Sequence, residues 1–216
     1  MGLEIDLSEL EKKIRVFFIN KHILKQAITH SSFANEAHVP DNERLEFLGD
    51  AVIKLVISEY IYNRFPEKPE GDLTKIRSAV ISDDTLAKVA TRIKLGEYII
   101  LSENEKKTGG DKRRSNVANV FEAIVGAIYI DGGIGKARDF LIEMLRFEID
   151  KVSREGYIKD YKSALQEYTQ KQKLALPIYK VVSETGPKHQ KEFLVGVRVN
   201  GKVIGEGKGP TKKEGE

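Results

Sequence analysis

The chain has 216 residues and contains no cysteine. It can therefore form neither a disulfide framework nor a thiolate metal site, and a reducing, intracellular setting is compatible with that. No apolar run reaches the roughly 20 residues that a membrane-spanning helix needs. The N-terminal segment carries too many charges for a secretory signal. We therefore expect a cytoplasmic protein without a membrane partner.

The chain also has little net charge, only +3 at neutral pH. Its distribution is uneven: residues 151–216 contain 14 Lys and Arg against 8 Asp and Glu, whereas residues 1–150 contain 22 against 25. One part that contacts nucleic-acid phosphates and another that binds cations would produce this asymmetry. A solvated charged surface explains an excess of this size equally well.

Residues 42–52 place acidic side chains in a segment that otherwise has the composition of a core helix. The apolar positions that indicate a helix wanted in a core are Leu45, Phe47, Leu48, Val52, Leu55, Val56 and Ile57. Glu43, Glu46 and Asp50 recur at spacings of three and four, so they share one helix face. A buried carboxylate needs compensation, commonly by a metal ion. A solvated stripe on an amphipathic helix fits the same spacing.

A second segment, residues 117–130, is apolar nearly all round, which indicates a buried helix. Its strongly polar side chains, Asn119 and Glu122, lie three residues apart on one face. Two such helices suggest one shared interior site. Oxygen ligands, without Cys and without a His pair, suit Mg²⁺ or Mn²⁺ better than zinc. The chemistry that most often uses such a cluster is phosphoryl transfer or phosphodiester hydrolysis.

The hydrophobic pattern changes along the chain, from helical spacing in the first part to strand alternation near the C-terminus. Residues 1–150 show successive helical patterns separated by short breaks, without strand alternation. Residues 153–159 are the best candidate linker. Beyond them we expect a helix from Asp160 to about Lys173 and three strands, with Asn200-Gly201 as a hairpin turn.

These residues resemble the ribonuclease III family of double-stranded-RNA endonucleases. The run from Asn42 to Val52 is similar to the family signature, and further matching segments follow in the family's order: residues 30–36, 70–78, 107–115, 121–123 and 126–133. The C-terminal part resembles a double-stranded-RNA-binding domain. The resemblance implies an all-α helical endonuclease domain over residues 4–152 and a small α+β RNA-binding domain of α-β-β-β order over residues 160–216.

The resemblance also implies an activity and its residues. It implies a homodimer that cleaves double-stranded RNA with Mg²⁺, for which Mn²⁺ can substitute, in the processing of rRNA and mRNA precursors, and without a small-molecule cofactor. The metal ligands would be Glu46, Asp50, Asn119 and Glu122. Asp50 and Glu122 would be catalytic, and Glu43 and Glu70 are possible accessory acids.

For RNA binding, the resemblance points to three regions of the C-terminal domain. Gln166 and Glu167 would contact one minor groove of the duplex, and the loop with Lys188 and His189 would reach a second. The basic pair Lys212 and Lys213 would contact phosphates of the intervening major groove. An exposed loop histidine and a solvated basic tail are the ordinary alternatives for His189 and for the lysine pair.

The chain departs from the family pattern at two places. Asn119 stands where the family has an aspartate, and an asparagine offers a neutral carbonyl oxygen instead of a charge. The second helix of the RNA-binding domain is cut short after Lys212 and Lys213, so we expect that domain to be incomplete. Asn119 keeps a second function open, that of a non-cleaving double-stranded-RNA-binding protein. A third, an unrelated helical metal phosphohydrolase, is weakened because no His-Asp dipeptide occurs.

Overall fold

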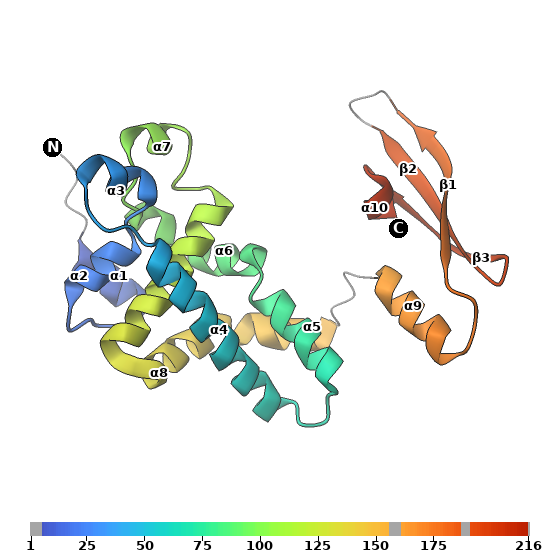
Figure 1. The fold of residues 1–216 in the computed structure, drawn as a ribbon, viewed down its shortest axis with the longest axis horizontal. Helices are drawn as coiled ribbons and strands as arrows, with labels where there is room; N and C mark the ends of the chain where they lie inside the picture. The colour runs from blue at the N-terminus through green and yellow to red at the C-terminus, as the bar shows by residue number, and fades with distance from the viewer. Residues whose placement is uncertain (1–5, 156–160, 187–190, 216) are drawn as a thin grey trace. The chain divides into compact units, whose positions relative to one another are not determined.

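The computed structural model describes residues 6–155, 161–186 and 191–215, which belong to two compact units, residues 1–156 and residues 157–216 (Figure 1). The described part of the first unit is helical. Its elements are α1 (Leu7–Ile14), α2 (Lys21–Ala27), α3 (Ser31–Ala37), α4 (Glu43–Arg64), α5 (Glu70–Val80), α6 (Asp83–Arg92), the 3₁₀ helix η1 (Leu95–Tyr98), α7 (Glu103–Lys107) and α8 (Arg114–Glu155).

Helix α8 forms the centre of the first unit. It packs most extensively against α4 and also contacts α6, α2 and α5. Fully buried side chains of α8 include Phe121, Ile124 and Ile128. The helix bends at Gly133, whose φ of 78° lies in the left-handed region that favours glycine. The bend lets Phe140 in the second half of α8 meet Phe121 in the first, with ring centroids 5.6 Å apart.

By length and composition alone, Arg114–Arg154 could cross a membrane, contrary to the expectation that no apolar stretch reaches that length. More than half of its apolar window, 56%, is buried inside the unit. The bend at Gly133 also interrupts its helical conformation. Both features are those of the core helix of a folded domain.

Helices α4 and α8 approach each other closely at two glycines. A Cβ atom on Gly49 of α4 would collide with the carbonyl of Glu122 on α8. A Cβ atom on Gly126 of α8 would collide with the carbonyl of Leu45 on α4. The two backbones can therefore cross at this separation only because both residues lack a side chain.

The helical character expected for the first unit is confirmed. The helix that carries residues 43–52 ends at Arg64, before Pro66, and Ser82 caps α6 by accepting a hydrogen bond from the backbone N–H of Thr85. Two short helices, α3 and α7, were not expected, because neither is long enough to establish a helical period. The predicted linker overlaps α8, since residues 153–155 are helical; residues 156–160 lie outside the described residues.

Two apolar residues of α4 are not in the core as the periodicity suggested. Phe47 is 80% exposed and Leu55 is 61% exposed. By helical spacing, Phe47 falls opposite the buried side chains of Leu45, Val52 and Val56, and Leu55 falls on the flank of α4 between the two faces. The apolar surface of α4 is therefore only partly buried within one copy of this chain.

The second unit contains α9 (Tyr161–Lys171), β1 (Ile178–Thr185), β2 (Glu192–Val199), β3 (Lys202–Gly209) and the short α10 (Lys212–Gly215). The strands form an antiparallel sheet in the order β1-β2-β3 (Figure 1). Asn200 and Gly201 both have positive φ angles, 51° and 79°, as a two-residue hairpin turn between twisted strands requires. The expected α-β-β-β order is confirmed, and α10 follows it as a single turn against β2 and β3.

The close approach of α4 and α8 at Gly49 and Gly126 leads to a prediction about stability. Gly126→Ala should lower the free energy of unfolding by about 1–3 kcal/mol or more, because the added methyl group forces α4 and α8 apart. Gly71→Ala is the matched control, since a Cβ atom there meets nothing within 4 Å. The control should be neutral or stabilising by up to about 1 kcal/mol. Urea unfolding measures both, and equal values for the two variants would contradict the role of the crossing.

Candidate functional site

The crossing of α4 and α8 brings the predicted acidic residues together. Glu46 and Asp50 flank Gly49 on α4, and Glu122 belongs to the α8 turn whose carbonyl touches that glycine. Asn119 lies one turn earlier on α8. Its side-chain amide donates a hydrogen bond to the carboxylate of Glu46. Four side chains that the sequence assigned to one site therefore come from two helices in direct contact.

The electrostatics of this acidic cluster (Glu46, Asp50 and Glu122 with Asn119) follow from partial burial and from mutual repulsion. Burial, followed by the negative charges of Asp50 and Glu46, raises the pKa of Glu122 to about 7. Burial and the neighbouring Glu43 also raise the pKa of Glu46, while the hydrogen bond from Asn119 lowers it. The cluster thus holds more negative charge than its surroundings compensate.

Two further charged residues belong to this environment, and the sequence pattern did not point to either. The ammonium group of Lys54 donates a hydrogen bond to Asp50 Oδ2 at 2.6 Å, and its charge lowers the pKa of Glu122. Asp83, the first residue of α6, has the opposite effect and raises the pKa of both Glu46 and Glu122. Helical spacing could have indicated Lys54, which is four residues after Asp50. Asp83 comes from a separate helix and gives no such signal.

The donor set suits a hard divalent cation. Carboxylate and amide oxygens are the ligands that Mg²⁺ and Mn²⁺ prefer, and partly buried carboxylates that repel one another are stabilised by a cation between them. In the described ranges, however, no three acidic or histidine side chains already lie close enough together to hold a metal ion. Lys54 and Asn119 each occupy a carboxylate of the cluster. The residues fit the ion by chemistry, and the predicted ligand set stays a prediction.

The two predicted accessory acids and the arginines at the start of α8 have different surroundings. Glu43 is exposed and acts on Glu46 through its charge. Glu70 accepts a hydrogen bond from Thr74 within α5 at 2.8 Å. Arg113, before α8, pairs with Glu105, and Arg114 pairs with Asp84 at 2.5 Å. These two arginines therefore tie the start of α8 to α7 and α6.

The predicted RNA-binding residues belong to the second unit. Gln166 and Glu167 are exposed on α9, one turn from the buried Thr169. Lys212 is exposed in α10, with its ammonium group 5.9 Å from the ring centre of Phe193. Lys213 also belongs to α10.

Lys188 and His189 lie outside the described residues. The prediction for that loop stays untested.

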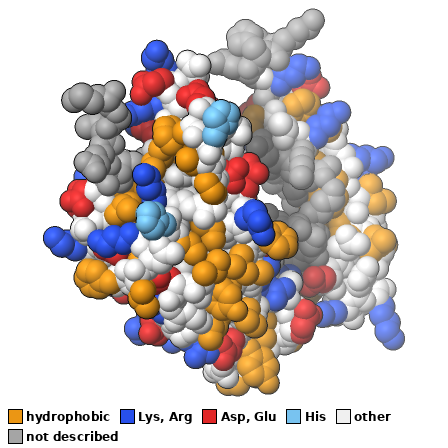
Figure 2. Space-filling view, turned by 60° about the vertical axis from the view of Figure 1, so that its left-hand side comes forward, with side chains coloured by type: hydrophobic (Ala, Val, Ile, Leu, Met, Phe, Trp, Pro, Cys, Tyr) orange, Lys and Arg blue, Asp and Glu red, His pale blue; other side chains and the backbone are white. Residues whose placement is uncertain are grey.

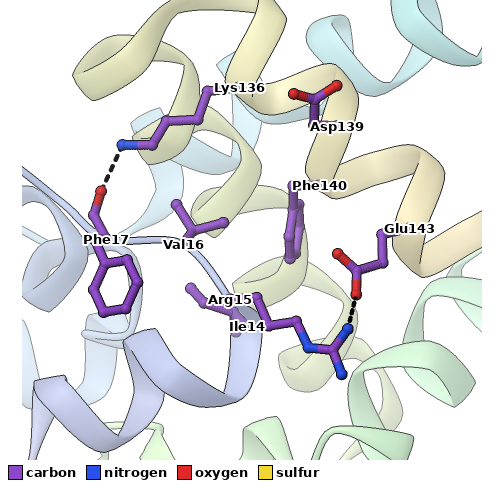
Figure 3. A pocket seen from close by; sticks show the side chains of 8 residues that line it. All are labelled: Ile14, Arg15, Val16, Phe17, Lys136, Asp139, Phe140 and Glu143. Atoms are coloured by element: carbon purple, nitrogen blue, oxygen red, sulfur yellow. Dashed lines mark hydrogen bonds and ion pairs between the residues drawn. The ribbon is translucent and has the colours of Figure 1, made fainter.

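A pocket elsewhere in the first unit contains none of the predicted site residues. It has a volume of about 350 Å³ and is lined by Ile14, Arg15, Val16, Phe17, Lys136, Asp139, Phe140 and Glu143 (Figure 3). Arg15 pairs with Glu143 at 2.6 Å, and Lys136 donates to the carbonyl of Phe17 at 2.5 Å. Arg15, Glu143 and Lys136 thus already have partners within the pocket lining. A duplex nucleic acid is read on open surfaces and grooves, so the partly exposed acidic cluster, and not this pocket, is the candidate site.

The raised pKa of Glu122 predicts how stability changes with pH in the absence of divalent ions. The unfolded carboxyl releases its proton near pH 4.5 and the folded one near pH 7, so rising pH favours unfolding between these values. Relative to Glu122→Gln, the parent should therefore lose about 1–2 kcal/mol between pH 4.5 and pH 8, a figure reduced for solvent screening.

Urea unfolding in a chelating buffer measures this difference at each pH. Glu36→Gln, at an exposed position of α3, is the control and should show no such trend. A difference between parent and Glu122→Gln that does not change with pH would contradict the proposed environment of Glu122.

Comparisons with known proteins show the family of both units. Residues 20–148 match the ribonuclease-III-like family and residues 161–216 match the double-stranded RNA binding motif. Ribonuclease 3 of Clostridium perfringens is 42% identical over 214 residues, which cover 99% of this chain and 90% of that protein. Ribonuclease 3 of a Geobacillus species is 43% identical, covering 96% of this chain and 85% of that protein.

A solved structure gives the same result for the first unit. The nuclease domain of ribonuclease III from Campylobacter jejuni is 37% identical, with a TM-score of 0.63, and the match covers 66% of this chain and 97% of that domain. From the family signature on α4 to the RNA-binding unit, this chain belongs to the ribonuclease III family.

Proposed function

We propose that this protein is a Mg²⁺-dependent endoribonuclease that cleaves both strands of double-stranded RNA and for which Mn²⁺ can substitute. The observation that carries the proposal is the cluster of Glu46, Asp50 and Glu122 at the α4–α8 crossing, in a chain that also has a double-stranded RNA binding motif. Family membership supports the reaction class, and the oxygen donors support the metal.

The residues of the cluster have separable roles in this proposal. Glu46 and Glu122 would hold the divalent ion through carboxylate oxygens, Asn119 would add a neutral carbonyl oxygen, and Asp50 would orient water and the scissile phosphate. When bound, the ion supplies Lewis-acid activation of water and stabilises the leaving oxygen. The water oxygen bonds to phosphorus as the bond to the 3′ oxygen breaks, which leaves a 5′-phosphate and a 3′-hydroxyl.

A non-cleaving RNA-binding protein on the same fold is the alternative that Asn119 raised. The relatives named ribonuclease 3, about 42% identical over nearly the whole chain, do not favour it. In addition, three carboxylates of the cluster remain, and Asn119 contacts one of them through its amide. We therefore expect a reduced affinity for the metal and not a loss of the reaction.

The second unit would supply most of the affinity for the substrate. Exposed Gln166, Glu167 and Lys212 are placed on its two helices, and residues 151–216 carry the excess of positive charge. Electrostatic contacts with phosphates dominate binding to nucleic acids. By resemblance, precursors of rRNA and mRNA in the cytoplasm are the expected substrates.

A homodimer is the expected assembly, with each copy cutting one strand. Phe47, Leu55 and Tyr62 of α4 are exposed by 80%, 61% and 69%, and Figure 2 shows hydrophobic side chains gathered over a broad area of one side of the molecule. Exposed apolar patches of this kind mark interaction sites. The related Campylobacter jejuni nuclease domain is described as having a region involved in dimer formation.

Restoring the missing carboxylate tests the proposed reaction. Asn119→Asp should raise the cleavage rate of a long RNA duplex, most strongly at low Mg²⁺, because a charged ligand binds the ion more tightly than an amide oxygen. Glu122→Gln is the control and should abolish cleavage while duplex binding stays within about twofold, because phosphate contacts elsewhere dominate affinity.

Cleavage is followed over a Mg²⁺ titration and binding by a filter or mobility assay. Equal rates for parent and Asn119→Asp at every Mg²⁺ concentration would show that Asn119 does not limit the site. Full cleavage by Glu122→Gln would refute the assignment of the cluster.

The dimer is tested by a charge on its expected surface. Phe47→Glu should convert the protein to a monomer, because an ionised carboxylate buried between two copies is strongly destabilising. Ile204→Glu, at a half-exposed position of β3 in the other unit, is the control and should leave the mass unchanged. Light scattering coupled to size exclusion gives both masses, and a Phe47→Glu protein of parental mass would contradict this surface.

A further inference from the structure

Among the described residues, Lys54 forms an ion pair with Asp50, one of the predicted metal ligands. Its ammonium group lies 2.6 Å from Asp50 Oδ2, one helical turn further along α4. Its charge also acts on Glu122, which belongs to α8. One side chain therefore influences carboxylates on both sides of the crossing.

A role in helix stability alone does not account well for this position. An Asp–Lys pair four residues apart on a helix contributes only about 0.3–0.5 kcal/mol, and both side chains are about half exposed, at 55% for Lys54 and 41% for Asp50. The charge of Lys54 would have a larger effect on the binding of a divalent cation, because the ammonium group repels it. Asp50 has two carboxylate oxygens, and Lys54 already uses one of them.

We propose that Lys54 is an intrinsic counter-ion of the acidic cluster, which neutralises Asp50 in the metal-free protein and lowers the affinity of the cluster for divalent cations. Asn119 does the same for Glu46 through its amide. The two residues keep the cluster stable without an ion. Lys54 is thus a positioning and charge-setting residue, since it acts through Asp50 and Glu122.

The consequence is a metal affinity set by competition. A divalent ion that binds Asp50 either displaces the ammonium group or binds beside it against its repulsion, and both weaken binding. Removing the charge should therefore tighten binding, whereas arginine at the same position should keep it weak. This inference rests on the proposed metal dependence of the nuclease, so its test must separate the two.

The test is a calorimetric titration of Mn²⁺ into the full-length, chelator-treated protein without RNA. Lys54→Met should bind Mn²⁺ about tenfold more tightly than the parent, which corresponds to about 1.4 kcal/mol. Lys54→Arg should stay within about threefold of the parent. Lys25→Met, which removes an exposed lysine from α2, is the matched control and should not change the affinity.

Thermal unfolding gives a second readout that does not depend on catalysis. Metal-free Lys54→Met should melt at a lower temperature than the parent, because Asp50 and Glu122 lose their counter-ion, and Mn²⁺ should raise its melting temperature more than that of the parent. This opposite pair of shifts would not follow from a purely structural role. Equal Mn²⁺ affinities for parent and Lys54→Met, or tightening in Lys54→Arg as well, would overturn the proposal.

Glu122→Gln separates failure of this inference from failure of the proposed function. If the parent binds Mn²⁺ and Glu122→Gln does not, the cluster is a metal site, and the Lys54 variants then decide the inference alone. If the parent, Glu122→Gln and Lys54→Met all fail to bind, both the metal site and the role of Lys54 are wrong. Binding by Lys54→Met alone would support the inference.

Discussion

The close crossing of α4 and α8 is the constraint on which the rest of this structure depends. Each helix contributes a glycine whose missing side chain leaves room for a carbonyl of the other, at Gly49 and at Gly126. Because Glu46 and Asp50 flank Gly49, and Glu122 supplies the carbonyl that touches it, the same contact that packs the core also assembles the acidic cluster. A wider crossing would separate the carboxylates and fill the gap with apolar side chains.

The crossing brings carboxylates close enough to repel one another, and neighbouring side chains offset that repulsion. Burial raises the pKa of both Glu46 and Glu122 and so disfavours their charged forms, and the charge of Asp50 adds to that effect on Glu122. Asn119 donates a hydrogen bond to Glu46, and Lys54 donates one to Asp50. A fully acidic cluster would be more repulsive without a cation and would bind one more strongly. The presence of Asn119 and Lys54 therefore shifts the balance toward stability of the metal-free protein.

The sequence predicted the parts of this site that follow a helical period. Spacings of three and four placed Glu46 and Asp50 on one face, and the apolar composition of residues 117–130 marked Glu122 as an exception in a buried helix. The Asn200-Gly201 turn and the end of α4 at Arg64 follow from local backbone preferences. These features are determined by residues close together in the chain, so their pattern carries the information.

What the sequence did not predict depends on contacts between distant segments. Asp83 reaches the cluster from α6, and only the tertiary packing reveals that it does. Phe47 belongs to an apolar pattern, yet it is 80% exposed, since periodicity cannot distinguish a side chain that packs within one chain from one left for a partner. Short helices such as α3 and α7 have too few residues to show a period.

The distribution of charge explains why the activity proposed here needs two units. Residues 1–150, which contain the cluster, carry a slight excess of acids, and residues 151–216 carry a clear excess of bases. An acidic site repels the phosphates on which it would act, and a bound divalent ion reverses that repulsion only close to the ion. Affinity for a long polyanion must then come from other residues of the chain. The basic second unit, with exposed polar side chains on α9 and α10, meets that requirement. The residues of the cluster can then serve metal binding and chemistry without also having to bind RNA.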